Sequence, residues 1–386
     1  RAQGRRMTET VFENARIVTP DGVVHGRLVA DGAGRIREIA ADGAATGRGE
    51  DLEGDWLLPG LVELHTDNLE RQVQPRPKVR WPGDAALVAH DGQIAAAGIT
   101  TVCDAICVGF YGGKQERLEF MELSLAAIRH GREAGTLRVD HRVHLRCEVS
   151  DPNVVELFER HVDEPSLALV SLMDHTPGQR QWHDLERYRT FHQGRSEASP
   201  EEFDAMVRRR IDEQERYART HRAAIVDLAR ARGLTLASHD DTTTDHVAEA
   251  HAEGCAISEF PTTRAAADAA RAAGMAIVAG APNVVLGGSH SGNVAAEDLA
   301  GGDLLDGLSS DYVPVSLMHA AFRFHDRLGW PLARAVDAVS GGPARMLGLH
   351  DRGALAPGLR ADLVRVRRAG EVPAVLGVWR EGRRVA

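Results

Sequence analysis

The central part of the chain alternates short apolar runs with helical segments, and this alternation constrains the fold more than any other feature. Such alternation is typical of βα units around a parallel sheet. The candidate strands are residues 61–65, 99–104, 142–148, 167–173, 234–239, 256–260, 276–279 and 305–311. Eight strands with helices between them predict a (β/α)8 barrel of the TIM type. The clearest helix should begin after Ser199, with Pro200 in its first turn and Glu202 completing a capping box.

Both ends of the chain differ from the middle, because short strands and glycine turns predominate there. Candidate strands are residues 11–18, 24–30 and 35–39 at one end, and 361–366 and 375–379 at the other. We therefore expect one small β-sandwich domain built from both termini. The predicted division is a sandwich of residues 7–57 and 350–386 and a barrel of residues 58–349. Residues 1–6 precede Met7, are interpreted as a leader remnant and are left out of the fold prediction.

Composition excludes several classes of protein. A formal net charge of -10 argues against a general nucleic-acid binder, although local cations can still bind a small anion. No apolar run approaches the roughly 20 residues that span a bilayer, so no membrane partner is expected. The four cysteines are scattered, form no CxxC pair and lie in or beside apolar runs. Buried reduced thiols in a cytoplasmic protein are therefore expected.

Metal-ligating side chains recur where the candidate strands end. His65 and Asp67 lie two residues apart, so both can point to one ion. Later strand ends carry Glu148, Asp174 and His175, His239 with Asp240 and Asp241, and Asp311. A lone histidine is usually structural, and an acid after a strand often caps the next helix. The joint pattern is stronger, because the carboxyl ends of barrel strands converge on one face. It predicts a first-row divalent metal centre.

Two segments resemble signatures of the amidohydrolase superfamily. Residues 58–67 (LPGLVELHTD) are similar to its first-strand signature. Residues 341–348 (GGPARMLG), with Gly353, 357–358 and 361–364, are similar to its closing signature. The resemblance spans nearly the whole chain, and the fold it implies is a barrel with a β-sandwich from both termini.

A narrower resemblance lies in longer motifs. They are residues 63–70, 75–79, 144–148, 173–181, 238–241, 259–263, 280–283, 287–293 and 308–314. These segments resemble the α-D-ribose 1-methylphosphonate 5-triphosphate diphosphatases of the carbon–phosphorus lyase pathway. The resemblance implies a metal-dependent phosphoric anhydride hydrolase that releases pyrophosphate from a small phosphorylated sugar. A homo-oligomer such as a dimer is expected.

The resemblance also implies a set of metal ligands. His65 and Asp67 would bind one ion, His175 and His239 a second, Glu148 would bridge them, and Asp311 would complete the site as general base. Asp67 replaces the superfamily's usual second histidine, and Glu148 its usual carboxylated lysine. Both changes add hard oxygen, so two divalent ions are expected, with zinc favoured and manganese or iron as alternatives. The superfamily places Glu148, His175 and His239 one strand later, which suggests an unrecognised strand between Asp104 and Arg142.

A triphosphate substrate also needs cations, since guanidinium groups meet phosphate bidentately. The candidate substrate-binding residues are Arg76, Lys78, Arg146, Arg180 and His290, the last within a glycine-rich loop. Surface solvation is the alternative for Arg76, Lys78 and the nearby Arg80.

Two other functions remain open. A cyclic amide hydrolase or deaminase could use the same metal ligands, because fold does not determine function. A non-catalytic scaffold is disfavoured, because all six candidate ligands are present. The basic segment from Arg76 to Arg80 and the loop at His290 favour the phosphate substrate.

Overall fold

The computed structural model describes residues 9–41, 49–109, 115–182, 184–193, 199–289 and 292–386. Eight parallel strands form the central sheet in chain order. They are β6 (Leu61–Thr66), β7 (Ile99–Val108), β8 (Asp140–Glu148), β9 (Leu167–Met173), β10 (Thr235–His239), β11 (Ile257–Glu259), β12 (Ala276–Gly280) and β13 (Gly307–Ser309). A parallel bridge between Thr66 and Asp311 joins the first strand to the segment after the last. The sheet is therefore a nearly closed barrel, which confirms the predicted (β/α)8 fold.

The expectation of an unrecognised strand between Asp104 and Arg142 is wrong. Strands β7 and β8 pair directly, from Thr101 opposite Asp140 to Val108 opposite Cys147. Direct pairing leaves no place in the sheet for a strand between them, and helix α3 (Gln115–Ala134) makes the connection. The eight strands counted from the sequence are the eight strands of the barrel.

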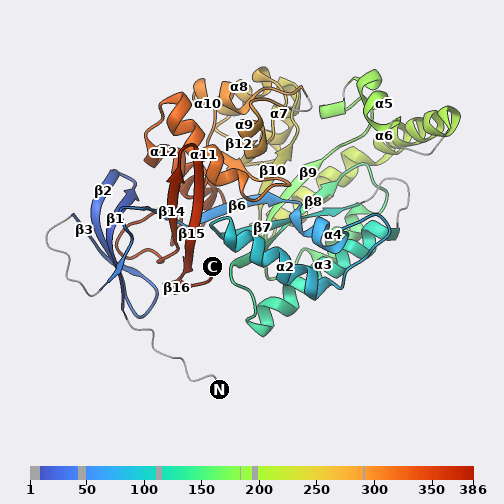
Figure 1. Ribbon diagram of the computed structural model, residues 1–386. Helices are drawn as coiled ribbons and strands as arrows, with labels where there is room; N and C mark the ends of the chain where they lie inside the picture. Colours follow the sequence, from blue (N-terminus) through green and yellow to red (C-terminus); the bar gives the residue numbers. More distant parts are fainter. Residues whose placement is uncertain (1–8, 42–48, 110–114, 183, 194–198, 290–291) are drawn as a thin grey trace.

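Helices surround the barrel and include the capped helix predicted from the sequence. The remaining helices are α1 (Asn68–Val73), α2 (Gly83–Ala96), α4 (Val154–His161), the short 3-10 helix η1 (Arg180–Trp182), α5 (Leu185–Gln193), α6 (Pro200–Arg230), α7 (Thr244–Ala252), α8 (Arg264–Ala272), α9 (Ala281–Leu286), α10 (Ala296–Gly301), α11 (Ser316–Leu328), α12 (Leu332–Asp337) and α13 (Gly341–Met346). At the start of α6 the Ser199 hydroxyl accepts from the Glu202 amide at 3.2 Å, and the Glu202 carboxylate accepts from the Ser199 amide at 2.8 Å. Helices α5 and α6 project from the barrel on the side away from β1–β3 (Figure 1). Among the described helices, none combines the length and apolar character of a membrane span.

The two termini share a second, curled sheet. Its strands are β1 (Thr10–Thr19), β2 (Gly22–Ala30), β3 (Ile36–Ala41), β4 (Glu50–Asp51), β5 (Trp56–Pro59), β14 (Leu363–Ala369), β15 (Val372–Arg380) and β16 (Arg383–Arg384). Strand β5 joins the two ends of the chain, since it pairs with both β1 and β14. Gly60 then leads into the barrel, where a Cβ atom would lie 2.2 Å from the Thr100 hydroxyl oxygen. Only glycine allows this close passage from the small sheet into β6.

Apolar side chains support the barrel from both sides. The main core lies between strands and helices, and a smaller cluster of Leu64, Leu169, Ala237, Ile257 and Val278 is contributed by five of the barrel strands. The four cysteines are free, and Cys103, Cys147 and Cys255 are buried, as expected for reduced thiols. Burial raises the pKa of the Cys103 thiol, which keeps it protonated.

Candidate metal centre

The carboxyl ends of the barrel strands gather histidines and carboxylates around one pocket. The predicted ligands lie at the end of β6, at the end of β8, after β9, at the end of β10 and after β13. The pocket has a volume of about 240 Å³, and its lining includes His65, Arg146, His175, His239 and Asp311. This is the face on which TIM-barrel enzymes place their active sites.

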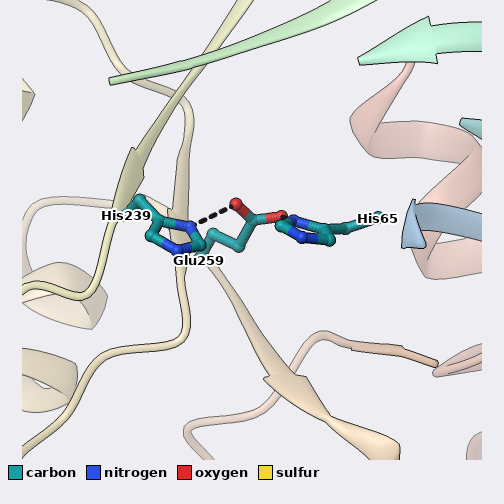
Figure 2. Close-up of side chains that lie close together, drawn as sticks. All are labelled: His65, His239 and Glu259. Carbon is teal, nitrogen blue, oxygen red and sulfur yellow. Dashed lines mark hydrogen bonds and ion pairs between the residues drawn. The ribbon is translucent and has the colours of Figure 1, made fainter. Parts of the chain in front are cut away.

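Glu259 fixes the orientation of two of these histidines. The Nδ1 atoms of His65 and His239 each lie 2.8 Å from a different oxygen of the Glu259 carboxylate (Figure 2). The two imidazole rings are nearly parallel, with centroids 5.7 Å apart. Since a carboxylate accepts, each Nδ1 carries hydrogen, and Nε2 is the ring nitrogen left to bind a metal ion. A buried carboxylate behind metal-binding histidines is a common way to set their tautomer and raise their basicity.

Besides the hydrogen-bonded set of His65, His239 and Glu259, the described residues bring two further groups of three donors together at the pocket. The first is His65, Asp67 and Asp311, and the second is His175, His239 and Asp240. Within each group the donor atoms lie within 4.8 Å of one another. Three protein ligands with open positions are typical of a catalytic metal site, and mixed imidazole and carboxylate donors suit zinc, iron or manganese. The donor chemistry therefore fits a divalent ion in each group.

The backbone turns sharply where the strands end. Asp240, Phe260 and Asp311 have φ angles of 57°, 57° and 53°, in the left-handed region that residues other than glycine rarely adopt. Each residue directly follows or lies two beyond a barrel strand. Such strained conformations persist only where the surrounding structure holds them, and they cluster at functional sites. Here they accompany the two aspartates of the metal groups.

Glu148 lies behind His175. One carboxylate oxygen is 2.8 Å from His175 Nδ1, and the other accepts from the His175 amide at 3.1 Å and the Ser150 hydroxyl at 3.1 Å. Glu148 thus supports His175 as Glu259 supports the other two histidines. Its bridging of two ions stays a prediction.

Asp311 is held in a setting that favours a proton acceptor. Burial and then the neighbouring Asp67 carboxylate raise the pKa of Asp311. The next helix, α11, begins at Ser316, its N-cap is Val315, and no side chain caps it. Asp311 therefore does not serve as the cap of that helix, which was the alternative to a catalytic role.

Arg146 is the predicted substrate-binding residue that reaches the pocket. It projects from β8, its side chain is buried, and its guanidinium lies 3.0 Å from the Asp67 carboxylate and 3.4 Å from His239 Nε2. A buried guanidinium beside both metal groups is well placed to meet a phosphoryl oxygen.

Other predicted substrate-binding residues lie elsewhere. Arg180 is buried away from the pocket lining, where it pairs with Asp241 and donates to the His239 carbonyl at 3.3 Å. Arg76 and Lys78 are exposed on the loop after α1 and do not line the pocket. Arg80 pairs with Glu119. His290 lies outside the described residues.

A larger cavity, of about 880 Å³, lies at the opposite ends of β12 and β13. Its arginines Arg271, Arg334 and Arg345 each pair with an aspartate. Paired guanidinium groups at the amino ends of barrel strands indicate structural roles, because catalytic residues of this fold lie at the carboxyl ends.

Sequence reasoning missed Glu259 as a member of the site, and it placed Asp240 at a strand end without assigning it to a metal ion. Glu259 ends β11 as Glu148 ends β8, and the sixth candidate strand, residues 256–260, already contained it, so a position near a strand end was a usable signal. Asp240 follows His239, but only the left-handed backbone shows that its side chain turns toward the histidines.

Solved structures resemble the whole chain in fold. 5-Methylcytosine deaminase from Klebsiella pneumoniae is 16% identical with a TM-score of 0.64, covering 98% of this chain and 97% of its own. N-acetyl-D-glucosamine-6-phosphate deacetylase from Mycobacterium smegmatis is 18% identical with a TM-score of 0.64, covering 98% and 100%. These likenesses show a shared fold, a barrel whose strand ends in this chain carry imidazole and carboxylate donors.

Curated sequences identify the family more closely, although no protein-family profile matches. Alpha-D-ribose 1-methylphosphonate 5-triphosphate diphosphatase from Escherichia coli K12 is 45% identical over 377 residues, covering 97% of this chain and 100% of its own. An allantoinase from Streptomyces avermitilis is 35% identical over only 99 residues, covering 25% of this chain and 20% of its own. The chain belongs to the α-D-ribose 1-methylphosphonate 5-triphosphate diphosphatase family.

Proposed function

We propose that this hydrolase cleaves α-D-ribose 1-methylphosphonate 5-triphosphate between its α- and β-phosphates and releases pyrophosphate. The main support for this proposal is the pocket in which two metal-binding groups and the buried guanidinium of Arg146 meet. A guanidinium suits a phosphate substrate better than a neutral cyclic amide. The 45% identity to the Escherichia coli diphosphatase supports the same substrate.

Divalent ions, when bound, supply Lewis acidity that polarises the phosphoryl group and makes water a nucleophile at neutral pH. His65, Asp67 and Asp311 would hold one ion, and His175, His239 and Asp240 the other. We propose zinc as the native metal, with manganese or iron as alternatives, since both groups mix imidazole and carboxylate.

The chain's own residues then divide the chemistry. Asp311 accepts a proton from the attacking water while the water oxygen bonds to the α-phosphorus. The bond between the α-phosphorus and the bridging oxygen breaks, and pyrophosphate leaves with the electron pair. Arg146 stabilises the negative charge that develops on the phosphoryl oxygens. Glu259 and Glu148 keep the three histidines in place throughout.

The rest of the substrate extends beyond the enclosed space. A pocket of about 240 Å³ is smaller than the roughly 300–1,000 Å³ of most ligand sites. Polar side chains of Gln181, Asn283, Ser289 and Asn293 are among those that line it. We propose that the outer phosphates reach toward these side chains and the glycine-rich loop at His290, with Arg76 and Lys78, on the exposed loop after α1, as further contacts.

Metal content tests the proposed ligands. Wild-type protein should carry about two divalent ions per chain, and His239→Ala should strip or greatly weaken one of them. Elemental analysis after dialysis measures both. A full complement of metal in His239→Ala would contradict the assignment. The matched control is His325→Ala, since the His325 ring contacts the Trp330 carbonyl and does not line the pocket.

We further propose a cytoplasmic homo-oligomer, such as a dimer. Free, largely buried cysteines suit a reducing compartment. Trp81 and Leu286 are large apolar side chains with 52% and 69% of their surface exposed, as at contact surfaces between subunits. Sedimentation equilibrium tests the oligomer, and a monomer at all concentrations would contradict it.

A further inference from the structure

A buried chain of hydrogen bonds lies outside the pocket, between α2, β7 and β8. Asp104 of β7 accepts from His90 Nε2 at 2.7 Å with one oxygen and from His141 Nδ1 at 2.7 Å with the other. His141 Nε2 lies 3.3 Å from the Asp91 carboxylate. All four side chains are fully buried. Buried polar groups of this kind are expensive unless every member is satisfied.

This chain of hydrogen bonds has two ends. At one end, the side-chain amide nitrogen of Asn68 lies 2.9 Å from His90 Nδ1 and donates to the Gln93 side chain at 2.9 Å. At the other, Asp91 accepts from the Arg138 amide at 2.8 Å and its guanidinium at 2.9 Å. The chain of hydrogen bonds therefore runs from the start of β8, at the far side of the barrel, to the start of α1, beside the pocket.

Hydrogen bonds rather than a metal ion hold this cluster together, although His90, Asp104 and His141 are close enough to bind a metal ion jointly. His90 Nδ1 accepts from Asn68, so its Nε2 carries the hydrogen given to Asp104. Both His141 nitrogens face carboxylates, so both donate. These partners leave no ring nitrogen lone pair for an ion.

The charges balance with His141 protonated. Burial alone would lower the pKa of His141, but the Asp104 and Asp91 carboxylates outweigh it and raise the pKa to about 9. Burial would raise the pKa of Asp104, but His141 and His90 outweigh it and lower the pKa to about 2. Two carboxylates thus face one imidazolium and the Arg138 guanidinium.

The end at Asn68 matters because Asp67 is the single residue between β6 and α1. On one side, the Thr66 hydroxyl donates to the Asp311 carbonyl at 2.8 Å. On the other, the buried Asn68 side chain is held by His90 and Gln93. The Asp67 amide itself donates to the Asp311 carbonyl at 3.0 Å. The main chain at Asp67 is therefore anchored on both sides.

We propose that His90, Asp104 and His141 are positioning residues for the metal group that contains Asp67. By holding Asn68, they fix the start of α1 and keep the Asp67 carboxylate beside His65 and Asp311. This proposal rests on the proposed metal-binding role of Asp67. It goes further by assigning a function to a buried cluster that touches neither metal nor substrate.

Metal affinity tests the proposal in a background that isolates one group. His175→Ala weakens the other group, so the remaining ion reports on His65, Asp67 and Asp311. In that background we expect His90→Leu to weaken zinc binding by about 10-fold or more, as measured by competition with a chelator. His90→Gln, which can still bridge Asn68 and Asp104, should restore much of the affinity.

A matched control separates positioning from simple destabilisation. Leu87 lies on the same helix as His90, is buried, and packs near Gly131 of α3. Leu87→Ala should lower the melting temperature while leaving zinc affinity unchanged. If His90→Leu does not fold, Asn68→Ala cuts the same connection at its other end and should weaken zinc binding likewise.

Two results would overturn the proposal and can be told apart. Wild-type affinity in folded His90→Leu or Asn68→Ala, with metal present in the parent, would refute the positioning role alone. Absence of metal from the His175→Ala parent and the wild type would refute the proposed metal centre together with it.

Discussion

Glu259 determines which nitrogen atoms of His65 and His239 face the pocket, because one carboxylate accepts from both rings. Replacing it with glutamine leaves one acceptor oxygen, and the amide hydrogens then oppose the second Nδ1–H. We predict that Glu259→Gln lowers metal affinity by roughly 10–100-fold while the protein stays folded. Chelator competition and thermal melting measure the two effects. Unchanged affinity would show that the histidines need no such support, and Glu215→Gln on the exposed face of α6 is the control.

Asp311 combines a raised pKa with a place beside the pocket. We predict that Asp311→Asn keeps the fold and most of the metal but lowers kcat by at least about 10²-fold, as expected for loss of a general base. Steady-state kinetics at saturating metal, with elemental analysis, measure this. Normal turnover would require the base to be sought elsewhere, first at Asp240 or Asp241.

Arg146 and Arg180 should differ in what their loss changes. Arg146 faces the pocket, so Arg146→Ala should lower kcat/KM by roughly 10–100-fold, equivalent to about 1.5–3 kcal/mol. Arg180 pairs with buried Asp241, so Arg180→Ala should mainly reduce the free energy of unfolding, by roughly 3–5 kcal/mol. Kinetics and denaturant unfolding of both variants test the contrast. An unchanged kcat/KM in Arg146→Ala would remove it from the substrate site.

At the scale of elements, the packing of α2 against β7 and β8 should depend on pH through His141. The pKa of His141 in the folded protein, about 9, lies above the usual histidine value of 6.5, so its stabilising effect is complete below pH 6.5 and lost as pH rises toward 9. That interval corresponds to at most roughly 3 kcal/mol. Asp104 has the opposite pH dependence, because its pKa is lowered. Its contribution to the free energy of unfolding is lost as pH falls from 3.8 toward 2.

Comparison with a variant isolates this effect from other titrating groups. In His141→Phe the loss of unfolding free energy between pH 6.5 and 9 should be smaller than in the wild type. Denaturant unfolding at several pH values measures both curves. Parallel curves would mean that His141 carries no charge in the folded protein.

Elements formed by local interactions were predictable from the sequence. The start of α6 depends on Ser199 and Glu202, three residues apart, and the barrel strands and the longer strands of the terminal sheet follow from short apolar runs. The two-residue strands β4 and β16 contain only charged residues and gave no such signal. The supposed extra strand arose from aligning Glu148 and His175 with a superfamily pattern. Direct pairing of β7 with β8 shows that this chain instead places its donors one strand earlier.

At the scale of the whole molecule, closure of the barrel brings the donors together. The six predicted ligands all lie at one mouth, because strand ends share an edge whatever the loops between them do. Which of them face an ion depends on contacts between residues far apart in sequence, such as Glu259 with His65. Arg180 and Arg146 look alike in sequence, and only tertiary pairing with Asp241 separates their roles.

The division into domains stays a proposal at this scale: residues 7–57 with 350–386 as the small domain, and 58–349 as the barrel. Strand β5, which ends at Pro59, links the two sheets through Gly60. Arg352 also donates to Asp140 at the start of β8 at 2.7 Å, so the C-terminal segment is fastened to the barrel.

The central claim is that water attacks the α-phosphorus and pyrophosphate leaves. Phosphorus NMR of the metal-loaded enzyme with α-D-ribose 1-methylphosphonate 5-triphosphate in ¹⁸O-labelled water tests it most directly. We predict a pyrophosphate resonance without label and a ribose 5-phosphate ester resonance shifted by one ¹⁸O atom. Release of single phosphate, or label in the pyrophosphate, would contradict the account.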